Sequence, residues 1–267
     1  MSQTAHARPL RASTASRVGF GVLGAAGELL ITLGVLLLGF LVWQLWWTDV
    51  VANREQASIV QQLPWAQPSL PTAAAAASPS PGAPVTAAPV KTAVPRHDAP
   101  PVEAEPGHAV TFATIQVPRW AGTPAKPVSE GTDKATVLDR LGVGHYEGTA
   151  MPGAVGNFAV AGHRTTYGKP FNRIAEIQVG DAVVVRTQHT WYVYKVTSIE
   201  IVRPTQVEVV APVPDKPGTA PTQRMITMTT CNPMYSASQR YVVHGVLDYW
   251  ASADDGSVPA ELLSAAS

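Results

Sequence analysis

An uncharged apolar stretch near the N-terminus constrains this chain more than any other feature. From Leu29 to Trp47 the sequence contains no charged residue, and a run of this length is about what a helix needs to cross the hydrocarbon core of a bilayer. The sequence therefore predicts a transmembrane helix within residues 18–47. We expect Glu28 at the interface where the span begins, because burying a carboxylate in the bilayer is costly.

The flanks of this stretch predict its orientation. Arg8, Arg11 and Arg17 precede it, and basic flanks stay in the cytoplasm. The chain is thus expected to be a single-pass protein of the cytoplasmic membrane, with residues 1–17 inside the cell and everything after Trp47 outside. A cleavable signal peptide is the alternative. It would have a shorter apolar region followed by small residues, whereas Trp-Gln-Leu-Trp-Trp follows here, so an uncleaved anchor is favoured.

Residues 48–108 predict an extracellular linker. A short polar helix can continue to about residue 62. Beyond it, residues 64–107 are rich in proline and alanine and almost free of large apolar side chains. Such a tract cannot bury enough surface to offset its chain entropy, so we expect an extended, semi-stiff spacer.

Residues 109–250 predict an all-β domain. Short apolar or alternating runs are separated by turn signals such as Val-Gly-Asp at 179–181, while residues 134–141 can form one or two helical turns. Many short strands with few helices favour a closed barrel or a sandwich, followed by a C-terminal tail at 251–267. The clearest strand-like runs are 111–118, 157–163, 182–187, 191–202, 224–230 and 241–250.

The charge balance excludes one class of partner. The chain has 19 basic and 19 acidic residues and a formal net charge of zero. A nucleic-acid-binding protein would normally show a basic excess or a basic stripe. We therefore expect no nucleic-acid partner.

The only cysteine of the chain, Cys231, lies at the end of a strand-like run. A lone cysteine cannot form an internal disulfide, and outside the cell an unpaired cysteine suggests a reactive thiol. An inert cysteine in the core is the alternative interpretation. A catalytic thiol also needs an acid or base and a group that stabilises an oxyanion.

Two residues can supply these groups. His163 ends a strand-like run. Arg240 lies nine residues after Cys231, at the start of the strand-like run that follows the cysteine. A loop of that size can bring a strand-end thiol close to a strand-start guanidinium, whose fixed donors and permanent charge suit an oxyanion. From the residues alone, His145 and His244 compete with His163, because both lie beside strand-like runs.

The motifs around these residues resemble those of the sortase family. TMTTC at 227–231 is similar to the sortase signature TLXTC, with methionine in place of leucine, and AGHR at 161–164 resembles the segment that carries the family histidine. Arg240 matches the family arginine that follows the cysteine strand. The stretches at 144–166, 231–233 and 239–245 look most like actinobacterial class E sortases. The resemblance covers about Val110 to Trp250.

The resemblance implies a closed eight-stranded β-barrel that acts as a cysteine transpeptidase on the outer face of a Gram-positive cell. Such an enzyme would cleave exported proteins between Thr and Gly of an LPXTG-like signal, or an LAXTG-like signal in class E. The thioacyl-enzyme would then pass the protein to an amine of a peptidoglycan precursor, lipid II. By this resemblance Cys231 is the nucleophile, His163 the general acid and later the base, and Arg240 the oxyanion and substrate clamp.

Two more residues are expected near the substrate. Thr230, next to the thiol, is expected to help position the substrate backbone. Tyr146 either lines the groove, where its ring would disfavour a proline and its hydroxyl would bond a peptide group, or is an ordinary barrel aromatic. Asp181 and Asp248 are interpreted as turn or surface residues rather than a third catalytic member.

No cofactor and no metal is expected. Sortases need no organic cofactor, and some of them use calcium. In this chain Glu208 and Asp215 stand apart in the long 203–223 loop, which gives no convincing carboxylate cluster.

Other classes fit less well. A papain-like peptidase would carry a CGSCW-like stretch near its start, and an L,D-transpeptidase would carry its His-Gly before the cysteine. Here His244-Gly245 follows Cys231. The remaining alternative is a membrane-anchored, non-enzymatic binding or structural β domain with a buried core cysteine.

Overall fold

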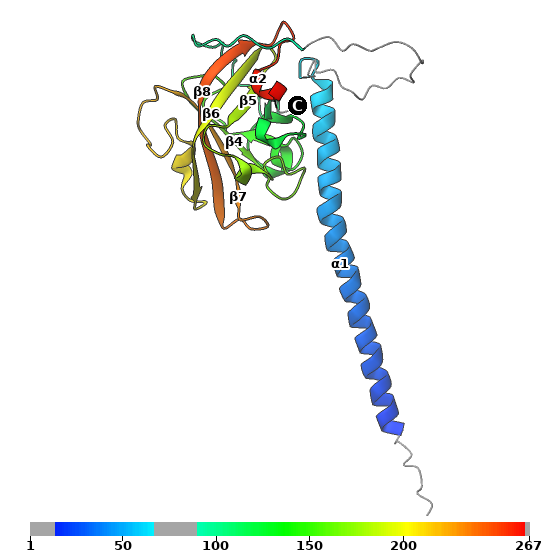
Figure 1. The fold of residues 1–267 in the computed structure, drawn as a ribbon. Coiled ribbons are helices and arrows are strands. Elements are labelled where there is room, and N and C mark those ends of the chain that lie inside the picture. The colour runs from blue at the N-terminus through cyan, green and yellow to red at the C-terminus, as the bar shows by residue number, and fades with distance from the viewer. Residues whose placement is uncertain (1–13, 67–89, 265–267) are drawn as a thin grey trace, which may run out of the picture. The chain divides into compact units, whose positions relative to one another are not determined.

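The computed structural model describes residues 14–66 and 90–264, and it separates into two compact units, 1–47 and 48–267 (Figure 1). Most of the expected cytoplasmic tail, including Arg8 and Arg11, lies outside the described residues. The same holds for the central part of the expected linker, 67–89, and for the last three residues of the chain.

Helix α1 (Thr14–Gln62) contains the predicted membrane span. From Gly24 onward it is long and apolar enough to cross a membrane. Its large apolar side chains between Leu29 and Trp43 are exposed, an arrangement that water disfavours and lipid accommodates. Near the end of the span, the rings of Trp43 and Trp47 stack with centroids 6.4 Å apart. The helix therefore fits a single-pass membrane anchor.

The last part of α1, from Thr48, belongs to the second unit and contacts the loop around Gly168. Asp49 accepts a hydrogen bond from the backbone of Gly168 at 3.1 Å. Gln56 is 1% exposed and donates to the carbonyl of Tyr167 at 3.0 Å. This part of the expected linker is thus helical and bonded to the β domain.

Residues 90–108, also within the expected linker, run along the barrel. Thr92 forms a β-bridge with Val258 and Arg96 forms one with Trp250. The Arg96 guanidinium lies 4.3 Å from the centre of the Trp250 ring. The segment has few large apolar side chains of its own, so its order comes from these contacts, which the local composition does not reveal.

Eight strands close into a barrel, which confirms the predicted all-β fold (Figure 1). Their order around the barrel is β1-β2-β3-β4-β7-β8-β6-β5, and the pairing of β1 with β5 closes it. Short helical turns, η1 (Pro118–Trp120), η2 (Lys134–Leu138), η3 (Ile174–Glu176) and η4 (Val207–Val210), and helix α2 (Ala260–Ser264) connect or follow the strands. The strands are β1 (Thr111–Gln116), β2 (Lys126–Glu130), β3 (Val143–His145), β4 (Gly156–Gly162), β5 (Ala182–Arg186), β6 (Thr190–Val202), β7 (Arg224–Asn232) and β8 (Gln239–Ser252).

Alternating residues of the strands build the core. Phe158 and Val160 of β4 point inward and are buried in one cluster with Ile226 and Met228 of β7. Because side chains alternate along a strand, the residues between them face outward. On this outer face, apolar side chains of the loop after β6 cover Val242 of β8.

Strand β7, which ends with the Cys231 region, lies between β4 and β8. It pairs in parallel with β4 on one side and antiparallel with β8 on the other. The β4–β7 contact joins residues 68 positions apart, because β5 and β6 lie between the two strands in the sequence.

Candidate active site

The thiol and the guanidinium come from adjacent strands. Cys231, at the end of β7, is the direct register partner of Arg240 at the start of β8. Opposite residues of an antiparallel pair have their Cβ atoms about 5 Å apart, so both side chains can reach one substrate group. Cys231 is partly exposed, as a nucleophile must be.

The histidine lies on the other side of β7. The parallel register pairs Ala161 with Thr229. One step further along, the Thr230 hydroxyl donates to the Gly162 carbonyl at 2.6 Å. His163 directly follows Gly162, the last residue of β4, and therefore lies at the end of the strand that neighbours β7.

Cys231 and Arg240 belong to the outer face of the barrel. On β7, Met228 faces the core, so Cys231, an odd number of residues away, faces outward. On β8, Val243 is in the core, so Arg240 faces outward by the same alternation. The thiol and the guanidinium thus lie on the same face of two paired strands, and His163 directly follows the strand on the other side of β7.

A carboxylate holds the histidine. His163 Nε2 lies 2.6 Å from Asp139 Oδ1, and both side chains are largely buried. The His163 ring also lies on the Tyr167 ring, with centroids 5.1 Å apart. Within the described part of the chain, His163 Nδ1 has no hydrogen-bond partner, so this nitrogen is available to exchange a proton with a thiol or a substrate amine.

Asp139 is a site residue that sequence reasoning missed. It lies 24 positions before His163, directly after η2, in a segment for which the sequence indicated only helical turns. Neither spacing nor periodicity connects it to the histidine. Asp181, which the sequence assigns to a turn or the surface rather than to the catalytic set, forms an ion pair with Arg119.

We expect Asp139→Asn to lower kcat about 10- to 100-fold with little change in KM. An amide binds the imidazole less firmly than a carboxylate does, and the loss of a residue that positions a functional histidine typically lowers activity by about this factor. Steady-state kinetics with a signal peptide measure both constants. The matched control is Asp181→Asn, which removes a carboxylate that pairs with Arg119 and not with the histidine. A rise in KM alone in Asp139→Asn would assign Asp139 to substrate binding rather than to positioning His163.

Arg240 keeps donors for a ligand. Its Nη1 donates to the carbonyls of Ala237 and Gln239 at 3.1 and 3.0 Å. A guanidinium carries five N–H donors, so the two backbone contacts orient the fork without exhausting it. The group is therefore able to bind a developing oxyanion next to Cys231.

Thr230 and Tyr146 have different surroundings. Thr230 is 3% exposed, and its hydroxyl bonds the Gly162 carbonyl, so this hydroxyl ties β7 to β4 just below the site. A substrate contact would require it to leave that bond. The Tyr146 hydroxyl lies 3.0 Å from Thr229 Oγ1, and Thr229 shares the outward face with Cys231. Tyr146 thus lies along the surface that leads to the thiol.

The competing histidines have other partners. His145 is fully buried, and its Nδ1 lies 2.8 Å from Glu130; burial raises the pKa of this Glu130 carboxyl. His244 lies on β8 four residues beyond Arg240, between Thr227 and Glu200. Neither of them is brought next to Cys231 by the strand register.

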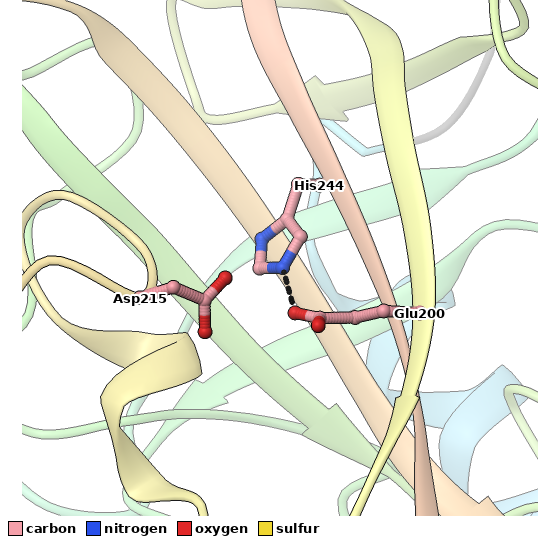
Figure 2. A group of neighbouring side chains, drawn as sticks. All are labelled: Glu200, Asp215 and His244. Carbon is pink, nitrogen blue, oxygen red and sulfur yellow. Dashed lines mark hydrogen bonds and ion pairs between the residues drawn. The ribbon is translucent and has the colours of Figure 1, made fainter.

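The expectation that Asp215 stands apart is wrong. Its carboxylate lies close to Glu200 and His244 (Figure 2). The three residues come from the end of β6, from the following loop and from β8, so their proximity arises only in the folded barrel.

Comparisons with known proteins show the family of the chain. The family model described as Sortase domain matches residues 115–248. Sortase SrtE1 of Streptomyces coelicolor is 38% identical over 229 residues, which are 83% of this chain and 56% of that protein. Sortase SrtE2 of the same organism is 32% identical over 252 residues, 92% of this chain and 90% of that protein. The chain thus spans little more than half of the first relative and most of the second.

Solved structures of sortases also match the chain. The SrtA sortase from Actinomyces oris matches with a TM-score of 0.61 and 44% identity, over 64% of this chain and 97% of that one. The crystal structure of Sortase E1 from Streptomyces coelicolor with a tripeptide in the active site matches with a TM-score of 0.53 and 39% identity, over 58% of this chain and 97% of that one.

Proposed function

Because the chain belongs to the sortase family of cysteine transpeptidases, we propose that it cleaves the sorting signal of exported proteins and transfers them to a cell-wall amine. The observation that carries this proposal is the direct pairing of Cys231 with Arg240 on the outer face of the barrel, with His163 directly after the strand on the other side of β7.

In the first half-reaction, the Cys231 thiolate attacks the carbonyl carbon of the threonine in the Thr–Gly bond. The carbonyl oxygen becomes an oxyanion, which the Arg240 guanidinium stabilises. When the tetrahedral intermediate collapses, the C–N bond breaks and His163 gives a proton to the departing glycine amine. The product is a thioester between Cys231 and the threonine.

In the second half-reaction, an acceptor amine attacks the thioester carbonyl. His163 takes the proton that the amine loses, and Arg240 again stabilises the oxyanion. The C–S bond then breaks, an amide forms, and the Cys231 thiolate is regenerated beside the protonated His163. Water in place of the amine would give hydrolysis, so the yield of transfer depends on how well the amine competes.

We further propose that the signal is LAXTG-like or LPXTG-like and that the acceptor is the amine of lipid II. The family resemblance supports both assignments. The apolar span of α1 and the preceding arginines support a catalytic domain on the outer side of the cytoplasmic membrane. The alternative of a non-enzymatic domain with a core cysteine gains no support, because Cys231 is partly exposed and belongs to none of the buried clusters that the described residues form.

The test uses the full chain in detergent micelles with fluorogenic LAXTG and LPXTG peptides, with and without an added amine. We expect cleavage of at least one peptide, a thioacyl adduct on Cys231 by intact mass spectrometry, and a new amide product when the amine is present. A small charged alkylating agent should label Cys231 and block turnover. A folded protein that forms no adduct with either peptide and resists alkylation would refute the proposal.

Tyr146 is expected to contribute to the choice of signal. The Tyr146 ring would narrow the substrate groove and so disfavour the ring of proline. Its hydroxyl, which is bonded to Thr229 in the structure, could turn to accept a hydrogen bond from the backbone N–H of alanine, which proline lacks. Both effects would make the enzyme prefer LAXTG over LPXTG. Tyr146→Ala should then lower the ratio of kcat/KM for LAXTG to that for LPXTG several-fold, mainly by slowing LAXTG, since one hydrogen bond contributes about 1 kcal/mol.

Tyr146→Phe serves as the matched control for this prediction. It keeps the ring and removes the hydroxyl, so it separates the two contributions. An unchanged ratio in both variants would assign Tyr146 to packing. A wild-type preference for LPXTG would contradict the predicted preference for LAXTG itself.

A further inference from the structure

A second cluster of titratable side chains lies on the same outer face as the active site, further along the sheet. Glu200 is near the end of β6, Asp215 is in the loop after it, and His244 is on β8. Each offers one ligand atom, and these atoms lie within 4.8 Å of one another (Figure 2). His244 Nε2 is 2.9 Å from Glu200 Oε1.

A chain of hydrogen bonds outside the cluster fixes the orientation of the imidazole. The Asn157 side-chain amide donates to the Ala211 carbonyl at 3.0 Å, so its oxygen is the atom that accepts the Thr227 hydroxyl at 2.8 Å. Because the Thr227 hydroxyl proton is used in that bond, its oxygen must accept from His244 Nδ1, at 2.9 Å. Nδ1 therefore carries a hydrogen, and in neutral His244 it is the Nε2 lone pair that faces the carboxylates.

This orientation leaves a place for a cation. A hydrogen bond of 2.9 Å joins Nε2 to the Glu200 carboxylate, so one of the two groups carries a proton there, and a bound metal ion would take the place of that proton. His244 is almost fully buried, whereas Glu200 is about one-third exposed and Asp215 lies at the surface, so the cluster is closed on the barrel side and open on the loop side. Histidines that bind metals commonly have their other ring nitrogen held by a second group in this way.

We propose that Glu200, Asp215 and His244 bind a divalent transition metal ion, with zinc as the best match. One imidazole nitrogen and two carboxylate oxygens form a donor set that zinc accepts with a fourth position left for water. Calcium prefers six to eight oxygen ligands and fits this set less well.

The geometry needs only small adjustments. Zinc–ligand bonds of about 2.0–2.2 Å in a tetrahedron separate the ligand atoms by roughly 3.3–3.6 Å. The His244 and Glu200 atoms are 2.9 Å apart and would have to separate by about 0.5 Å. The Asp215 ligand atom lies within 4.8 Å of the other two and would have to approach them by at most about 1.5 Å. The site is separate from the catalytic centre, because His244 is four residues from Arg240 along β8, about 13 Å at the normal rise of a strand.

The test is calorimetric titration of the full chain in detergent micelles with zinc chloride. Wild type and Cys231→Ala are both titrated, because the second lacks the thiol as a competing ligand. In the Cys231→Ala background we expect one zinc per chain, and at least about tenfold weaker binding after Asp215→Asn, Glu200→Gln or His244→Gln. The loss of one ligand typically has an effect of that size. The matched control His189→Gln, which removes an exposed histidine paired with Asp254, should leave zinc affinity unchanged.

Asp215→Asn is the decisive variant, because an exposed loop residue can be changed without unfolding the barrel. Zinc should also raise the unfolding temperature of the parent and not that of Asp215→Asn, as expected for a ligand that binds only the folded state. Undiminished zinc affinity in Asp215→Asn, or no binding of zinc to the parent, would overturn the proposal. The peptide-cleavage assay is independent of these outcomes.

Discussion

Replacing Cys231 by alanine is expected to reduce cleavage of signal peptides by at least about 10⁴-fold, because the covalent route through the thioester disappears with the nucleophile. The barrel should remain folded, since Cys231 is a partly exposed residue at the end of β7 and Ala removes only one sulfur atom from it. Initial rates with a fluorogenic peptide, together with the unfolding temperature, measure both effects.

The matched control for this variant is wild type treated with the charged alkylating agent. It should lose activity to a similar extent, because the same sulfur is blocked in an unchanged backbone. Turnover by a well-folded Cys231→Ala protein at a rate near that of wild type would show that another group is the nucleophile.

Arg240→Lys is expected to lose about 10²- to 10³-fold in kcat although the charge is kept. Lysine presents a single ammonium group, whereas the guanidinium presents a planar fork that the carbonyls of Ala237 and Gln239 orient. Stabilisation of an oxyanion depends on the position of the donors, and the loss of one such group typically has this effect. Single-turnover formation of the thioacyl-enzyme isolates the step concerned.

Arg173→Lys is the matched control, because Arg173 is partly exposed and pairs with Glu176 away from β7. It should retain wild-type rates. Near-normal thioacyl formation in Arg240→Lys would mean that only the charge matters, and equal losses in both arginine variants would point to a general effect on stability.

Features that depend on neighbouring residues could be predicted from the sequence. Hydropathy and length indicated the apolar helix, and the alternation of apolar residues with turn signals indicated the β domain. The pairing of Cys231 with Arg240 is also local, because one short connection joins β7 to β8.

Features that depend on contacts between residues far apart in the sequence could not be predicted from it. Three histidines are candidates from the sequence, and only the parallel pairing of β4 with β7 shows that His163 follows a strand next to the one that carries the thiol. Asp139 reaches His163 from a different element, and Glu200, Asp215 and His244 assemble from three. No periodicity encodes such contacts, since each one is fixed by how the barrel closes. The ordered parts of the expected linker, at 48–62 and 90–108, likewise depend on their contacts with the barrel.

The parallel contact of β4 with β7 has a consequence for the folding chain. It closes a loop that contains two complete strands, and contacts of such high sequence separation are slow to form. A nascent chain that has left the ribosome only as far as β6 has its histidine but neither the thiol nor the arginine. Even the complete chain cannot bring them together until β7 has inserted between β4 and β8. The proposed catalytic groups are therefore assembled only in a chain whose β7 has paired with both of its neighbours.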